Sequence, residues 1–275
     1  MTQFAFETWD DGRLLVNRQF ASLLARHGWN TFERMMSLEG QVARRVGARE
    51  TVRLELDCES TGDAGPPTAF YIKRYGPPPW REYWKPLLKF TRPIVGARVE
   101  WDAMLAFHRL GLPTMTPVMY GQAGRRSFVI TEALEGYVKL TEWIDAHCPS
   151  AAAAGDAYRT AIEKLAPLTR TMHDAGVHHQ DYYLCHVLVP EEVGPPGMHI
   201  IDLGRARVRR RLGARWRVKD LAQLDYSADP VSALGRLRFL RRYLDRPFRR
   251  LDRALIWRIA LKRRLIARHS AKNRL

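Results

Sequence analysis

The sequence has few cysteines and no long apolar run, and these two absences exclude several classes of protein. Cys58, Cys148 and Cys185 are scattered along 275 residues, without the spacing of a disulfide framework or a zinc ribbon. No apolar stretch reaches the roughly 18 residues that a membrane-spanning helix needs. The start of the chain carries acidic residues and no apolar segment, which argues against a secretory signal. We therefore expect a protein of the reducing cytoplasm.

Acidic residues are scarce in the last quarter of the chain. The formal net charge is +16, and residues 203–275 hold 23 lysines and arginines against five acidic residues, a net of +18. The rest of the chain is close to neutral, with a net of −2. An anionic partner is therefore expected at the C-terminal part. The length and the 46% of apolar residues allow one large domain or two small lobes.

The first part of the chain, residues 1–134, is predicted to be a small β-rich lobe. Its β-branched and aromatic runs predict strands at 39–44, 51–56, 69–75, 118–120 and 128–131. The first two flank Gly47 and suit a hairpin, and a loop rich in glycine and proline follows at 58–68. Helical spacing of apolar residues predicts a helix over 99–110. Residues 132–136 resemble a connector.

The second part, residues 135–275, is predicted to be a larger helical lobe. A helix is expected over 158–175, two short strands at 187–189 and 199–203, and only helices beyond residue 215. Apolar residues at helical spacing between 231 and 270 indicate that one face of the basic tail packs. Trp101 and Trp257 are expected in the core.

Four charged residues occur along the sequence in the order that is typical of enzymes that transfer phosphoryl groups. Lys73 lies in a strand, Glu100 lies in the next helix, and Asp181 and Asp202 lie at strand ends in the second part. Because this reaction depends on positioning and charge neutralisation, each residue has a predicted task. Lys73 would contact the ATP phosphates and Glu100 would hold its ammonium group. Asp181 would accept the proton of the attacking hydroxyl, and Asp202 would bind Mg²⁺.

Three segments carry a more specific resemblance. They are HHQDYYLCHVL (178–188), IIDLGRA (200–206) and RWRVKDLAQLDYSA (215–228), and the segments at 93–101 and 112–121 extend the match. Over about 37–243 the chain resembles the lipopolysaccharide core kinase family, and within it the heptose(I) kinases of the inner core. The resemblance implies an α+β, bilobal protein-kinase-like fold with extra basic C-terminal helices. It also implies a kinase that transfers a phosphoryl group from ATP to a heptose of the lipopolysaccharide inner core.

The resemblance assigns further residues and shows where the chain departs from general kinases. His186 stands where those kinases have a metal-binding asparagine, so we predict a metal or phosphate contact there. The glycine-rich loop is degenerate: only Gly40 and Gly47 are available to bind the nucleotide, and Glu132 is predicted to join them. No Ala-Pro-Glu motif follows Asp202, which favours a glycosidic acceptor over a protein. Residues predicted to bind that acceptor are Arg205, Arg207 and Lys219.

Structural roles compete with functional ones at several positions. His178, His179, Cys185 and His186 could be taken for a zinc cluster, but we expect His179 to brace the catalytic loop and Cys185 to be buried. Asp220 is expected to be a buried anchor that accepts hydrogen bonds from the catalytic-loop backbone. The solvated face of a helix remains an alternative for Arg205, Arg207 and Lys219.

The basic tail has two candidate partners, nucleic acid and an anionic lipid surface. No nucleic-acid-binding motif is present, so we predict a cytoplasmic protein that is peripheral to the inner membrane and binds no nucleic acid. The alternatives are a Kdo kinase or another small-molecule phosphotransferase of the same fold. A pseudokinase that binds an anionic glycolipid or nucleic acid is a further alternative, although it would not need all of Lys73, Glu100, Asp181 and Asp202.

Overall fold

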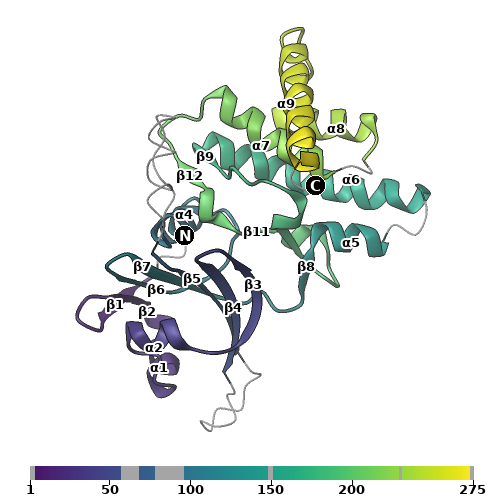
Figure 1. Cartoon of the computed structure of the whole chain (residues 1–275). Helices are drawn as coiled ribbons and strands as arrows, with labels where there is room; N and C mark the ends of the chain where they lie inside the picture. The colour runs from purple at the N-terminus through teal and green to yellow at the C-terminus, as the bar shows by residue number, and fades with distance from the viewer. Residues whose placement is uncertain (1–3, 57–67, 78–95, 148–150, 229–230, 273–275) are drawn as a thin grey trace. The chain divides into compact units, whose positions relative to one another are not determined.

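The chain folds as two compact units, Met1–Glu135 and Gly136–Leu275 (Figure 1). The structure, a computed structural model, describes residues 4–56, 68–77, 96–147, 151–228 and 231–272. Most of the loop predicted at 58–68 lies outside these residues, as do Cys58 and Cys148. The division between the units falls within the segment that the sequence suggests as a connector.

The first unit contains a seven-stranded sheet in the order β1-β2-β6-β7-β5-β4-β3, with every neighbouring pair antiparallel. Its strands are β1 (Phe6–Trp9), β2 (Leu14–Asn17), β3 (Gln41–Val46), β4 (Arg49–Leu56), β5 (Thr68–Tyr75), β6 (Pro117–Ala123) and β7 (Arg126–Glu132). The five predicted strands are confirmed, whereas β1 and β2 were not predicted. The β3–β4 hairpin turns at Gly47, whose φ of +57° suits glycine.

Helices cover both faces of this sheet. On one face α1 (Arg18–Arg26) and α2 (Phe32–Ser37) bury Leu24, Phe32 and Met35 against the strands. The predicted β-rich character of this unit is confirmed, but α1 and α2 were not predicted. Two short helices form because the side chains of Asn17 and Thr31 accept hydrogen bonds from the first backbone N–H groups of α1 and α2.

The predicted helix at 99–110 is confirmed as α4 (Arg98–Arg109), which contacts β6 and β7. Trp101 of α4 is buried, as predicted. Successive residues of a strand point to opposite faces, so Phe70 and Ile72 of β5 join the core that contains α1 and α2. Lys73 points to the opposite face, where it meets α4. The alternation of β5 therefore brings a lysine to the α4 side of the sheet.

The second unit is mainly helical and is built around α6, α7 and α8 (Figure 1). Its helices are α5 (Leu140–His147), α6 (Ala151–Asp174), α7 (Ala214–Ser227), α8 (Ala233–Leu244) and α9 (Asp252–Lys272). Its strands are β8 (Tyr137–Lys139), β9 (Val177–His178), β10 (Val187–Pro190), β11 (His199–Ile200) and β12 (Arg207–Val208). Short 3₁₀ helices are η2 (Leu184–His186), η3 (Pro195–Gly197) and η4 (Leu203–Arg205). The predicted helix at 158–175, the two short strands and the helices beyond residue 215 occur in the predicted order, but β11 ends at Ile200. The elements α5, β8, β9 and β12 were not predicted.

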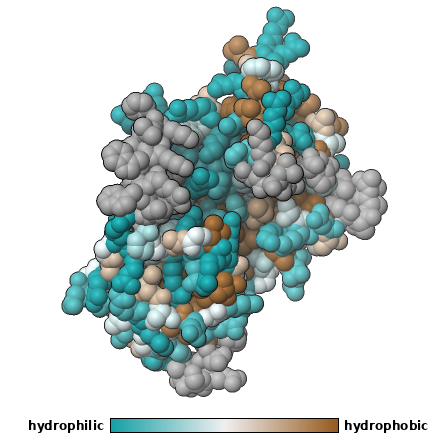
Figure 2. Space-filling model, viewed as in Figure 1, coloured by the Kyte–Doolittle hydropathy of each residue, from teal (hydrophilic) through white to brown (hydrophobic). Residues whose placement is uncertain are grey.

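The packing of α9 differs from the prediction. Leu255, Ile256 and Ile259 pack against the α6–α8 core, but Trp257 is 64% exposed, so its expected place in the core is wrong. Apolar residues occur on both faces of this helix, and the sequence pattern does not say which face packs. Figure 2 shows hydrophobic and hydrophilic residues side by side along the projecting α9. Among the described helices, none has the length and apolar character to cross a membrane.

Candidate active site

In the first unit, Lys73 of β5 and Glu100 of α4 form an ion pair. The Lys73 Nζ–Glu100 Oε1 distance is 2.7 Å, and the Tyr75 hydroxyl donates to Glu100 Oε2 at 3.0 Å. Glu100 is only 1% exposed, and a buried carboxylate is stable only when its oxygens have partners. Burial raises the pKa of Tyr75, so its hydroxyl keeps the proton that it donates. The predicted pair is therefore a three-residue cluster that holds the lysine ammonium in place.

The role of Tyr75 was missed in the sequence analysis, although a signal for it exists. Tyr75 lies two residues beyond Lys73 on the same strand, and strand residues two apart share a face. A hydrogen-bonding side chain at that position is therefore expected beside the lysine.

The structure gives local backbone reasons for the two glycines that were predicted to bind nucleotide. A Cβ atom at Gly40 would lie 2.5 Å from the Arg53 carbonyl oxygen, so only glycine allows this close approach to β4. Gly47 lies at the hairpin turn with a positive φ. Glu132 ends β7, where its backbone N–H donates to the Thr116 carbonyl. Binding of nucleotide by these three residues stays a prediction.

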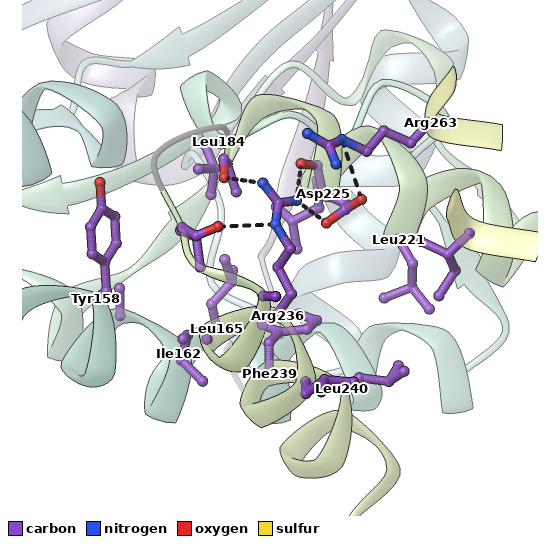
Figure 3. A pocket seen from close by; sticks show the side chains of 18 of the residues that line it. Tyr158, Ile162, Leu165, Leu184, Leu221, Asp225, Arg236, Phe239, Leu240 and Arg263 are labelled. Atoms are coloured by element: carbon purple, nitrogen blue, oxygen red, sulfur yellow. Dashed lines mark hydrogen bonds and ion pairs between the residues drawn. The ribbon is translucent and has the colours of Figure 1, made fainter. Parts of the chain in front are cut away.

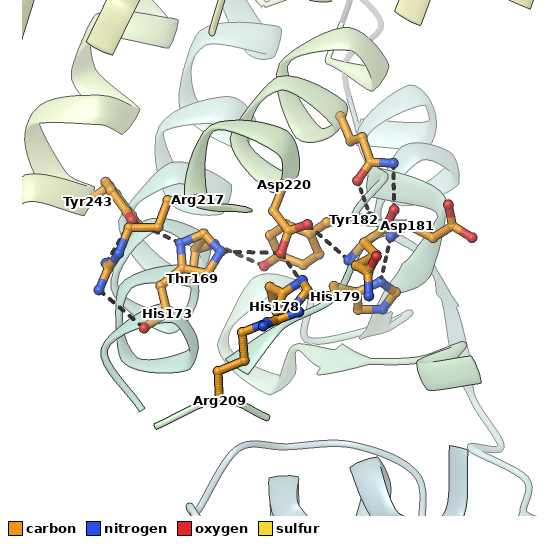
Figure 4. A network of polar contacts seen from close by, with 12 residues as sticks. Thr169, His173, His178, His179, Asp181, Tyr182, Arg209, Arg217, Asp220 and Tyr243 are labelled. Atoms are coloured by element: carbon orange, nitrogen blue, oxygen red, sulfur yellow. Dashed lines mark hydrogen bonds and ion pairs between the residues drawn. The ribbon is translucent and has the colours of Figure 1, made fainter. Parts of the chain in front are cut away.

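In the second unit, the loop that carries Asp181 is held by a buried carboxylate from α7 (Figure 4). Asp220 accepts hydrogen bonds from the backbone N–H groups of His179 at 2.7 Å and Gln180 at 2.9 Å, which confirms its predicted role as an anchor. Its side chain is fully buried and also lies 3.4 Å from His173 Nε2. Burial alone would raise the pKa of Asp220, but the contacts with His173 and His179 keep that pKa below its ordinary value.

Two further residues of α7 support the same loop and were not predicted. The Gln223 side chain accepts from the Tyr182 backbone N–H at 3.2 Å and donates to the Gln180 carbonyl at 2.8 Å. Ser227 Oγ accepts from the Leu184 N–H at 2.9 Å. With Asp220 they occupy positions i, i+3 and i+7 of one helix, which share a face. This spacing of polar side chains along one helix face is the signal in the sequence for their supporting role.

The side chain of Asp181 meets an arginine from the predicted acceptor group. Arg205 Nη1 lies 3.1 Å from Asp181 Oδ1 and 3.2 Å from Oδ2, so one nitrogen donates to both oxygens. Gln180 has a φ of +70° and donates from its side chain to the Arg205 carbonyl at 2.8 Å. Arg207 pairs with His178 in the β12–β9 ladder, and Lys219 lies on α7. The structure therefore brings one of the three acceptor candidates into contact with the candidate base.

Asp202 and His186 also lie together. His186 Nε2 is 3.6 Å from Asp202 Oδ2, and His186 Nδ1 is 2.7 Å from the Asp181 carbonyl oxygen. A carbonyl only accepts, so the Nδ1 atom carries the proton and Nε2 faces the carboxylate. Burial disfavours a charged ring, but Cys185, the Asp181 carbonyl and Asp202 together raise the pKa of His186 to about 9.

The predicted bracing role of His179 is confirmed. His179 is buried, and its Nε2 atom lies 2.9 Å from the carbonyl oxygen of Ile201, the residue before Asp202. The Asp181 N–H donates to its Nδ1 atom at 3.3 Å. Burial lowers the pKa of His179, which favours a neutral ring with one donor and one acceptor nitrogen. This one side chain therefore links the segments that carry Asp181 and Asp202.

The donor groups near Asp202 suit an ion that is bound mainly by phosphates and water. Within the described ranges, no group of three or more His, Cys, Asp or Glu side chains is arranged to hold a metal ion. Mg²⁺ commonly takes only one or two protein carboxylates beside substrate phosphates. One partly exposed carboxylate therefore fits Mg²⁺, whereas a zinc site needs three or four protein ligands.

Comparison with known proteins relates this arrangement to one group of enzymes. Lipopolysaccharide core heptose(I) kinase WaaP of Pseudomonas aeruginosa is 35% identical over 256 residues, which cover 88% of this chain and 90% of that protein. WaaP of Escherichia coli is 31% identical over 248 residues, with 85% and 88% covered. A solved structure of WaaP in complex with acyl carrier protein superimposes with a TM-score of 0.70 at 31% identity, covering 93% of this chain and 98% of that one.

These matches confirm the predicted kinase-like fold and the resemblance found in the sequence. The model of the lipopolysaccharide kinase (Kdo/WaaP) family matches residues 35–243, which include Lys73, Glu100, Asp181 and Asp202. The chain therefore belongs to the lipopolysaccharide kinase (Kdo/WaaP) family and is a phosphotransferase that uses ATP.

Proposed function

We propose that this protein transfers the γ-phosphoryl group of ATP to a hydroxyl of a heptose in the lipopolysaccharide inner core. The observation that carries the proposal is the loop of Asp181, whose backbone is fixed by the buried Asp220 carboxylate. Such a loop holds a carboxylate in one place, as positional catalysis requires. The naming of curated relatives as heptose(I) kinases supports heptose as the acceptor.

In this proposal each unit supplies one half of the machinery. Residues 1–134 form the nucleotide-binding lobe, in which Lys73 contacts the phosphates and is held by Glu100 and Tyr75. Residues 135–275 form the catalytic and substrate lobe, in which Asp181 takes the proton of the heptose hydroxyl. The hydroxyl oxygen forms the new bond to the γ-phosphorus, and the bond to the bridging oxygen of ADP breaks. We assign Arg205 to the binding of the same acceptor, and its contact with Asp181 supports this assignment.

We assign Asp202 as the ligand of Mg²⁺, with His186 as a further contact to the metal or the phosphates. Mg²⁺, when bound, would neutralise charge on the phosphates. The chain's own contribution is to hold the Asp202 carboxylate beside the base. His186 does this by contacting Asp202 on one side and the Asp181 carbonyl on the other.

The test measures phosphate transfer from labelled ATP to dephosphorylated core lipopolysaccharide. The Asp181→Asn variant is expected to lose transfer while it still binds ATP, since the substitution keeps the side-chain size and removes the base. Asp245→Asn is the matched control, because Asp245 is exposed on another part of the unit. Absence of transfer by the natural sequence, or equal transfer by Asp181→Asn, contradicts the proposal. Phosphate found on Kdo instead of heptose supports the Kdo kinase alternative.

We also propose that the protein acts in the cytoplasm at the anionic surface of the inner membrane, with α9 as the contact. Trp257, Leu261 and Leu265 are 64%, 42% and 48% exposed and lie four residues apart, so they share a face. Arg258, Arg264 and Arg268 are exposed beside them. An apolar row among cations suits the interface of an anionic bilayer, in which tryptophan is enriched.

Flotation with vesicles tests the membrane contact. Binding is expected to anionic and not to zwitterionic vesicles, and to weaken as salt rises. Trp257→Ala is expected to weaken binding to anionic vesicles, whereas Leu234→Ala, at a position of α8 that is also 64% exposed, is the control. Vesicle binding that is unchanged both by added salt and by Trp257→Ala would contradict the membrane contact. A clear preference for DNA over vesicles would contradict it as well.

The solved complex of WaaP with acyl carrier protein, together with an apolar cavity in this chain, favours an acyl carrier protein as a second partner. The second unit contains a partly open cavity of about 370 Å³ between α6, α7, α8 and α9 (Figure 3). Its lining is mostly apolar and includes Ile162, Leu165 and Phe239, and its polar edge is the Asp225–Arg236–Arg263 cluster. A hydrocarbon chain fits such a lining. Acylated carrier protein is expected to bind more tightly than the unacylated form, and equal binding of the two contradicts this use of the cavity.

A further inference from the structure

Three cationic side chains surround one indole ring in the second unit. Arg215 Cζ lies 4.6 Å and Arg209 Cζ 5.1 Å from the centroid of the Trp216 ring, and Lys219 Nζ lies 5.9 Å from it. The His178 ring stacks on the same indole, with centroids 4.4 Å apart and planes tilted by 30°. All three cations are within the range of a cation–π contact. We call this group the Trp216 cluster.

The Trp216 cluster brings three positive charges together around one ring. In the part of the chain that the structure describes, Arg209, Arg215 and Lys219 form no ion pair. Arg209 Nε instead donates to His178 Nε2 at 3.1 Å. Burial lowers the pKa of Lys219, and Asp220 beside it opposes that shift. Cation–π contacts are weak at exposed sites, so an added anion would relieve the repulsion among the cations.

The cluster is connected to the loop of the candidate base within the same unit. Arg209 follows β12, which pairs with β9, and β9 ends at His178, three residues before Asp181. Lys219 directly precedes Asp220, the anchor of that loop. Lys219 also lies close enough to Asp181 and Arg205 for its pKa to respond to both charges. A ligand held by the cluster is therefore held beside the group that would activate a hydroxyl.

We propose that Arg209, Arg215 and Lys219, arranged around Trp216, bind an anionic group of the acceptor, a carboxylate or a phosphate on a sugar next to the one that is phosphorylated. This inference rests on the proposed function, because it assigns the recognition element of the same acceptor. Guanidinium groups match the planar geometry of carboxylate and the oxygens of phosphate. The indole ring orients the arginines before the ligand arrives, which reduces the entropy lost on binding.

The test compares Arg215→Gln with Arg210→Gln in steady-state kinetics on a water-soluble core oligosaccharide. Arg215, in the first turn of α7, is exposed and contacts the indole ring. Arg210 is exposed in the segment before α7 and, among the described residues, makes no cation–π contact with that ring. Both variants remove one charge. Loss of one charged contact is expected to raise the acceptor KM about ten-fold. The KM for ATP is expected to stay unchanged, and Arg210→Gln to behave like the natural sequence.

Two modified acceptors identify the anion. A phosphate-free acceptor and a carboxyl-reduced acceptor are each compared with the natural oligosaccharide, and the one that lacks the bound group should abolish the effect of Arg215→Gln. An unchanged acceptor KM in Arg215→Gln, or equal effects of Arg215→Gln and Arg210→Gln, overturns the inference while the kinase function stands. Absence of transfer by the natural sequence to any acceptor contradicts the proposed function itself.

Discussion

Replacing Asp220 with asparagine tests whether this buried carboxylate sets the position of the catalytic loop. The Asp220 oxygens accept from His179 N–H and Gln180 N–H at 2.7 and 2.9 Å. Asparagine has one oxygen and one NH₂ group, so either rotamer leaves a buried N–H facing another donor. We expect Asp220→Asn to lower both the free energy of unfolding and the rate of transfer.

The expected loss of unfolding free energy in Asp220→Asn follows from the hydrogen bonds that the substitution removes or weakens. One backbone N–H loses its acceptor, and the remaining hydrogen bonds lose the charge that strengthens them. Each effect costs roughly 1–3 kcal/mol, so the expected loss is about 3 kcal/mol at neutral pH. That is a large fraction of the 5–15 kcal/mol by which domains are typically stable. Denaturant unfolding of Asp220→Asn and of the exposed control Asp174→Asn measures it, and the control should lose less than about 1 kcal/mol.

The pH dependence gives an independent check. The pKa of Asp220 is lowered in the folded protein, so its contribution to stability is present above the unfolded pKa of about 3.9 and is lost as pH falls through the lower folded value. The difference between the natural sequence and Asp220→Asn should therefore be constant near neutral pH and shrink in acid. A loss below about 1 kcal/mol, or a difference that grows in acid, would refute the anchoring role.

Three further predictions concern other parts of the molecule. Glu100→Gln removes the charge that holds Lys73, so kcat/KM should fall about 100-fold because the lysine is misplaced. Steady-state kinetics measure this fall, and unchanged far-UV spectra show that the fold is intact. A fall of less than about three-fold would contradict the holding role of Glu100. Gly40→Ala places a Cβ against the Arg53 carbonyl, so thermal unfolding should shift to lower temperature by an amount equivalent to about 1–3 kcal/mol; a raised KM for ATP without that shift would favour a phosphate-binding glycine instead. Burial lowers the pKa of His178 to about 4. Below about pH 6.5 the unfolded chain therefore binds a proton at His178, whereas the folded protein binds it only near pH 4. Because His178 is fully buried, stability should fall by roughly 3 kcal/mol between pH 6.5 and 4. His178→Gln should lack this decline, and parallel curves for the two proteins would argue against a buried neutral ring.

The charged residues of the candidate site could be predicted from the sequence, because phosphoryl transfer requires particular residue types in a particular order along the chain. Lys73 and Glu100 are 27 residues apart and still meet at 2.7 Å, as a strand lysine and a helix glutamate should. The support of the loop by Gln223 was not predicted, because it depends on how α7 packs against a segment some 40 residues away. The exposed position of Trp257 was missed for a related reason, since α9 has apolar residues on two faces and spacing alone cannot tell which is buried.

The position of α7 has a consequence for the length of the acceptor that can be phosphorylated. Lys219 and Asp220 are adjacent on this helix, one belonging to the Trp216 cluster and the other holding the loop of Asp181. Because successive residues of a helix differ by about 100° in direction, a one-residue insertion between them would rotate one contact away from the other. In the proposed mode of binding, α7 therefore fixes the distance between the bound anion and the reacting hydroxyl. Acceptors with a different span should bind and yet be phosphorylated slowly.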